Sequence, residues 1–201
     1  MNIVHPQSLR RRIEGIGFLA AYAACIPLAN WFIGHVGTTC PPGQPCLIPV
    51  APGGISAPSG VLMVGLALVL RDLVQRRLGI GWGIGAILVG AALSAAFAPP
   101  SLVIASVAAF VLSEVADLAV YTPLQRRGLV LAVFASSTVG LVVDSVLFLH
   151  LAFDSLAYLP GQIIGKAWMV LLSLPAIAWL KRRDEMDETA AIGMPRASEF
   201  D

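Results

Sequence analysis

Four ionisable side chains lie in stretches of the sequence that are otherwise apolar. They are Glu114 and Asp117 in VLSEVADLAVY (residues 111–121), Asp144, and Lys166. Ionisable residues near the centre of a bilayer are costly, and they usually face a cavity or one another. Carboxylates accept hydrogen bonds and an ammonium group donates them, so this set could bind a polar molecule with several N–H groups. A buried acid cluster could also carry a proton.

Spacing along the predicted helices places three of these side chains at similar depths. At 1.5 Å per residue, Lys166 lies roughly 15 Å deep, Glu114 roughly 20 Å deep, and Asp144 roughly 8 Å below the outer face. Side chains lean toward the N-terminus of their own helix. Lys166 and Glu114 therefore lean toward the outside and Asp144 leans inward. We expect the three to converge near the midplane.

This convergence has two interpretations. Lys166 could form an internal ion pair with Asp144 or Glu114 that only locks helices together. Alternatively, the side chains form a binding site. The presence of three acidic residues and only one basic residue favours the binding site. A structural ion pair would need only one carboxylate.

Glu114 and Asp117 are predicted to have different roles. At a spacing of three they share a helix face and lie within about 6 Å of each other. Joint ionisation of two such carboxylates is unfavourable in a low-dielectric site. We expect Asp117, which is nearer to Arg126 and Arg127 of the following turn, to stay charged. Glu114 is then expected to influence the ionisation of Asp117.

The composition indicates helices that span a membrane. Of 201 residues, 57% are hydrophobic and 12% charged, with a mean hydropathy of +0.82, whereas soluble domains are about 25% charged. The net charge of +1 suggests no nucleic-acid partner. A span needs roughly 20 apolar residues. The sequence therefore predicts an all-α membrane protein with six transmembrane helices, near 15–34, 58–77, 80–98, 101–120, 129–149 and 156–180.

The distribution of Lys and Arg predicts the orientation. Apart from Lys166, every basic residue falls on one side of a six-span topology, and the connections 35–57, 98–101 and 150–155 contain none. Basic residues favour the cytoplasmic side. We expect a multi-pass protein of the bacterial cytoplasmic membrane with both termini cytoplasmic. The expected parts are an N-terminal segment (1–14), a transmembrane domain (15–183) and a polar, disordered tail (184–201). The basic residues on the cytoplasmic side are Arg10, Arg11, Arg12, Arg71, Arg76, Arg77, Arg126, Arg127, Lys181, Arg182, Arg183 and Arg196.

The external loop 35–57 is uncharged and rich in Pro and Gly. It contains Cys40 and Cys46, which could form a disulfide if the loop faces an oxidising compartment. The loop is either a surface connection or a lid over an external opening.

Several short motifs resemble the VUT family of six-helix membrane proteins, the queuosine precursor transporters. The similarity runs over residues 15–180 and includes SEVADLAVY, SSTVGLVVDSVLFL and GKAWMVLLSLPAIAW. The positions that match the family pattern are Asn30, Asp72, Gly79, Ser113, Asp117, Ser137, Gly140, Asp144, Ser145, Phe148, Lys166 and Pro175.

The resemblance implies import of deazaguanine bases, 7-cyano- or 7-aminomethyl-7-deazaguanine. A carboxylate could accept two parallel N–H bonds from such a base, while Lys166, Asn30 or Gln162 donates to its carbonyl. Aromatic side chains, with Trp31 and Tyr121 among the candidates, could stack on its plane. The predicted substrate-binding residues are Asn30, Asp72, Glu114, Asp117, Ser137, Asp144, Phe148, Gln162, Lys166 and Trp168.

Two other classes of protein are alternatives to a stand-alone importer. A substrate-binding subunit for a vitamin or nucleobase could work with separate ATPase chains, since this chain has no GxxxxGK[ST] motif of its own. An intramembrane enzyme is disfavoured because His5, His35 and His150 lie at or beyond helix ends. No cofactor or metal is expected. The sequence leaves open whether the protein forms a homo-oligomer.

Overall fold

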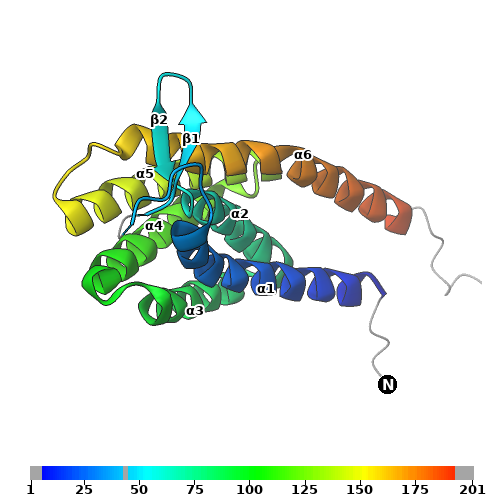
Figure 1. Ribbon diagram of the computed structural model, residues 1–201. Helices are drawn as coiled ribbons and strands as arrows, with labels where there is room; N and C mark the ends of the chain where they lie inside the picture. The colour runs from blue at the N-terminus through cyan, green and yellow to red at the C-terminus, as the bar shows by residue number, and fades with distance from the viewer. Residues whose placement is uncertain (1–5, 43–44, 193–201) are drawn as a thin grey trace, which may run out of the picture.

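The computed structural model describes residues 6–42 and 45–192, and six long α-helices dominate this part of the chain (Figure 1). A short 3-10 helix, Pro100–Leu102, precedes α4, and two strands lie between α1 and α2. The long helices are α1 (Pro6–His35), α2 (Val61–Leu78), α3 (Ile80–Phe97), α4 (Val103–Leu124), α5 (Leu129–Phe153) and α6 (Leu159–Ile192).

Within the described residues, five helices are long and apolar enough to cross a membrane: α1, α3, α4, α5 and α6. The remaining predicted span, 58–77, corresponds to α2. This helix has 18 residues and includes Arg71, Asp72, Arg76 and Arg77. α2 lies in the middle of the bundle and contacts all five other long helices (Figure 1). Its charged groups can therefore be surrounded by protein instead of lipid, which is where polar groups at membrane depth are tolerated.

The outer surface of the bundle is strongly apolar. Ile104, Leu88 and Leu172 are 84%, 68% and 66% exposed. Inside, one cluster of buried apolar residues joins α2, α4, α5 and α6, and another joins α1, α2 and α3. Large apolar side chains so exposed on several helices are unusual for a soluble monomer. They fit a multi-pass membrane protein.

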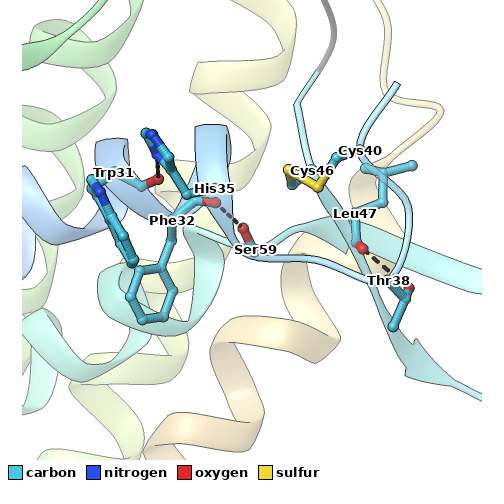
Figure 2. Close-up of a disulfide and its surroundings, with 8 residues drawn as sticks. All are labelled: Trp31, Phe32, His35, Thr38, Cys40, Cys46, Leu47 and Ser59. Carbon is cyan, nitrogen blue, oxygen red and sulfur yellow. Dashed lines mark hydrogen bonds between the residues drawn. A yellow bond between two sulfur atoms is a disulfide. The ribbon is translucent and has the colours of Figure 1, made fainter. Parts of the chain in front are cut away.

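The long connection between α1 and α2 is folded against the bundle. Strands β1 (Leu47–Ala51) and β2 (Ile55–Pro58) form an antiparallel hairpin. A disulfide joins Cys40 to Cys46 beside the end of α1 (Figure 2). The Nε1–H of Trp168 in α6 donates to the carbonyl of Val50 at 2.8 Å. The hairpin is thus tied to α6 close to Lys166.

Both ends of the chain are more helical than predicted. α1 begins at Pro6, inside the predicted N-terminal segment 1–14, and α6 continues to Ile192. The prediction of a disordered tail from Asp184 is therefore wrong for residues 184–192, and residues 193–201 lie outside the described part of the chain.

An ion-pair network explains why these ends are ordered. Arg77 of α2, only 2% exposed, contacts Glu14 of α1 at 3.0 Å and donates to both carboxylate oxygens of Asp184 at 2.9 and 3.0 Å. Arg183 reaches Glu14 at 2.6 Å. We call the end of the bundle that holds this network the terminal end. There the start of α1 and the ends of α2 and α6 are held together.

Candidate functional site

Arg71 is the centre of a buried ion cluster formed by α2 and α4. Its Nη1 lies 3.0 Å from Oδ1 of Asp72, its Nε donates to Oε2 of Glu114 at 3.0 Å, and its Nη2 lies 2.8 Å from Oδ1 of Asp117. All four side chains are at most 2% exposed. One guanidinium therefore holds three carboxylates, as its planar set of five N–H donors permits.

Polar side chains from neighbouring turns and helices support this cluster. Ser136 of α5 donates to Oδ2 of Asp72 at 2.7 Å. Arg71 also donates to Gln75 at 3.2 Å, and Gln75 in turn donates to Thr122 of α4 at 3.2 Å. The ring of Tyr121 lies 6.0 Å from the Arg71 guanidinium carbon. The arginine is thus fixed by contacts within α2 and with α4, and Ser136 of α5 holds its partner Asp72.

The cluster has more carboxylates than its single arginine neutralises. Buried charges are stable only when they are paired and hydrogen-bonded. Asp72, Glu114 and Asp117 together present six oxygens to one guanidinium. The arrangement retains the capacity to accept further hydrogen bonds from a ligand, or to take up protons.

Several buried polar atoms around the cluster lack a hydrogen-bond partner among the described residues. They include both carboxylate oxygens of Asp117, the hydroxyls of Tyr22 and Tyr121, and Oγ of Ser137. Tyr22, from α1, lies within electrostatic range of Glu114 and Asp117. Nearly all buried polar groups in proteins are paired. Such a group of unpartnered atoms indicates a place where a polar ligand or water binds.

Gly140 of α5 packs directly against Asp117. A Cβ atom added at Gly140 would lie 3.2 Å from Oδ2 of Asp117 and 2.9 Å from Cδ2 of Leu68. The absence of a side chain at position 140 therefore lets α5 approach α4 closely at the level of this carboxylate. Gly140 shares a face of α5 with Ser137 and Asp144, which lie three residues before it and four residues after it.

Lys166 forms a second polar cluster between α5 and α6. Its Nζ donates to Oδ2 of Asp144 at 2.6 Å and to Oγ of Ser145 at 2.8 Å. The ammonium group is buried, whereas Asp144 keeps 13% exposure. Of the two partners that the sequence offers for Lys166, the structure shows Asp144. Asp144 also lies within electrostatic range of Glu114, so the two clusters are neighbours.

The predicted partners of the carboxylates on α4 were wrong in part. We expected Arg126 and Arg127 beside Asp117, but Asp117 and Glu114 both contact Arg71. Arg71 was counted among the basic residues of the cytoplasmic side, yet it is fully buried. The physical reason is that α2 is enclosed by the other helices, which allows an arginine seven residues before its end to point into the bundle.

Other predicted site residues make contacts outside the two clusters or are simply buried. The amide of Asn30 donates to the carbonyl of Ile26 in its own helix at 3.1 Å. Trp168 is hydrogen-bonded to the β-hairpin. Phe148 packs edge-to-face on Phe153, with ring centroids 6.0 Å apart. Gln162 is buried in α6. Their participation in binding stays a prediction.

Sequence reasoning missed Arg71 as the central residue, together with Tyr22, Gln75 and Ser136. The available signal was the pair Arg71–Asp72, an adjacent base and acid well inside α2. Tyr22, Gln75 and Ser136 carry no such signal, because tyrosine, glutamine and serine are ordinary in membrane helices. Only the packing of α1 and α5 onto α2 shows that they belong to the site.

Charged side chains buried inside a bundle of apolar helices are typical of multi-pass membrane proteins that have a functional site within the bilayer. Within this class, the chain belongs to the Vut_1 family, described as "Putative vitamin uptake transporter", whose model matches residues 60–180. The matched range contains Arg71, Asp117 and Lys166. No match was found among curated proteins or solved structures. The resemblance predicted from the sequence is confirmed at the level of the family.

Proposed function

We propose that the protein imports 7-deazaguanine bases, the precursors of queuosine, across the cytoplasmic membrane of a bacterium. Membership of an uptake-transporter family supports the import of a small molecule. The observation that carries the choice of substrate is Asp117, a fully buried carboxylate whose Oδ1 lies 2.8 Å from Arg71 and whose Oδ2 has neither an ion-pair contact nor a hydrogen bond within the described ranges.

The chemistry of a guanine-like base is complementary to these groups. Its ring N–H and exocyclic amine are parallel donors, which one carboxylate accepts as a bidentate pair. Its carbonyl oxygen, next to the ring N–H, needs a donor, which the Arg71 guanidinium can supply. In this proposal the base takes over contacts that Arg71 and Asp117 otherwise make with each other.

The Lys166–Asp144 pair provides a second donor and acceptor for the same ligand. The pair is closed in this structure, with 2.6 Å between Nζ and Oδ2. We propose that Lys166 is bridged to Asp144 when the site is empty and donates to the substrate when it is full. The partial exposure of Asp144 fits a pair that can open to admit a ligand.

The orientation in the membrane is part of the proposal. At the terminal end, Arg10, Arg77 and Arg183 lie near one another in the ion-pair network. Basic residues near helix ends favour the cytoplasmic side. We therefore place both termini in the cytoplasm, with the hairpin and the Cys40–Cys46 disulfide outside.

Uptake by a bacterium that cannot make queuosine precursors tests this function. Cells carrying the chain should accumulate labelled 7-cyano- or 7-aminomethyl-7-deazaguanine, and unlabelled guanine or a vitamin should compete poorly. Strong competition by a vitamin, with no accumulation of either deazaguanine, would contradict the proposed substrate. Accumulation only when ATPase chains are co-expressed would show that the protein is the binding subunit of a larger transporter.

A further inference from the structure

A pocket at the terminal end of the bundle is separate from the Arg71 and Lys166 clusters. It has a volume of about 340 Å³ and lies where the ends of α2 and α6 meet the turn between α4 and α5. Four of its side chains are basic and two are acidic. The lining residues are Arg76, Gln125, Arg126, Arg127, Gly128, Leu129, Lys181, Asp184 and Glu185.

The basic side chains of this pocket are weakly neutralised. Arg126 and Arg127 are exposed and form no ion pair with any residue in the described ranges. Lys181 reaches only Glu185, one turn away, at 3.5 Å. Arg76 lies 3.9 Å from Asp184, whose carboxylate is already bonded through both oxygens to Arg77. The pocket therefore carries uncompensated positive charge.

We propose that this pocket binds the phosphate of an anionic lipid headgroup. Guanidinium groups match phosphate in charge and geometry, and basic pockets between helix ends are typical headgroup sites. Helix α5 begins at the lining residue Leu129, and in its first two turns Leu131 and Phe134 are 54% and 44% exposed. These side chains offer an apolar surface on which the acyl chains of the same lipid lie. A soluble phosphate would use the cations but not this surface.

Lipid retention by the purified full chain tests the proposal. The protein is extracted in mild detergent, mixed with phosphatidylglycerol or phosphatidylcholine, and examined by native mass spectrometry. The test variant is Arg126→Gln with Arg127→Gln. The matched control is Arg182→Gln, because Arg182 is an exposed arginine near the end of α6 that does not line this pocket.

We expect one phosphatidylglycerol to be retained preferentially by the wild type and by the control. The double variant should retain it roughly thirtyfold more weakly, since each of the two basic groups near an anionic lipid surface contributes about fivefold. Equal retention of the two lipids by the wild type would overturn the proposal. So would equal losses in the double variant and the control.

A competition arm separates the lipid from a soluble phosphate. Millimolar inorganic phosphate or glycerol 3-phosphate should leave phosphatidylglycerol bound. Complete displacement would show that the pocket recognises free phosphate and would contradict the lipid assignment.

Because the variants lie on the surface, their melting temperatures without lipid should equal that of the wild type. A lowered melting temperature for the double variant would contradict a purely ligand-binding role.

Discussion

Arg71 Nη2 lies 2.8 Å from Asp117 Oδ1 inside the bundle, and neither of these two atoms has a well-aligned hydrogen bond. This contact joins α2, the helix richest in buried charge, to α4. It also explains how two carboxylates on α4 can lie at membrane depth, because an arginine from the neighbouring helix compensates them. The same contact is the one that a substrate would open in the proposed transport cycle.

Arg71→Met should strongly destabilise the protein. The substitution leaves Asp72, Glu114 and Asp117 buried without their cation, and removal of one partner of a buried ion pair typically costs about 3–5 kcal/mol. Thermal unfolding in detergent should show a clearly lower melting temperature. Arg182→Met, on the surface, should melt like the wild type. An Arg71→Met variant as stable as this control would show that the cluster contributes nothing to the fold.

Lys166→Met should abolish uptake while the protein remains in the membrane. Methionine fills a similar volume, and Asp144 keeps enough exposure to be hydrated when it loses its partner. Uptake is measured in the auxotrophic strain and the amount of protein in isolated membranes. Lys181→Met, which removes a partly exposed lysine of the same helix, should transport normally. Normal uptake by Lys166→Met would remove this lysine from the site.

Glu14→Gln should loosen the terminal end. Glu14 accepts from Arg183 and contacts Arg77, and hydrogen bonds to charged groups contribute about 1.5–3 kcal/mol each. We expect a lower unfolding temperature and faster hydrogen exchange in the first turns of α1. Glu185→Gln is the matched control, since its carboxylate is 59% exposed and its pair with Lys181 is worth little. Identical unfolding of the two variants would contradict the role of the network.

Cys40, which is exposed, should react with a membrane-impermeant thiol reagent on intact cells after mild reduction of its disulfide, whereas Cys46, only 1% exposed, should react less. The prediction follows from the disulfide in the loop and from the orientation proposed above. Cys25, buried in α1, should not react. Labelling that requires broken cells would place the loop in the cytoplasm and reverse the orientation.

Much of the helical architecture could be predicted from the sequence because apolar runs of span length report directly on helices. The Lys166–Asp144 pair could also be predicted, since depth and side-chain lean depend only on helix geometry. Arg71 could not. Near a predicted helix end, an arginine that points to the interface and one that points inward have the same sequence pattern, and the packing of α2 decides between them.

The ends of the chain were mispredicted for a similar reason. Residues 184–192 are polar, and polarity alone suggested disorder. Their helix is continuous with α6 and is held through Asp184 by Arg77, a contact between residues more than a hundred positions apart. Hydropathy does not detect a long-range ion pair of this kind.

Uptake of a labelled 7-deazaguanine by Asp117→Asn and Glu114→Gln, at matched protein levels in the membrane, tests the central claim most directly. Asp117 has an oxygen, Oδ2, without a hydrogen bond in the described part of the chain, whereas Glu114 is hydrogen-bonded by Arg71, and glutamine can still accept that bond. Asp154→Asn, at an exposed site beyond α5, is the control and should transport normally. The account predicts that Asp117→Asn loses uptake and that Glu114→Gln keeps a substantial part of it. Normal uptake by Asp117→Asn, with none by Glu114→Gln, would contradict it.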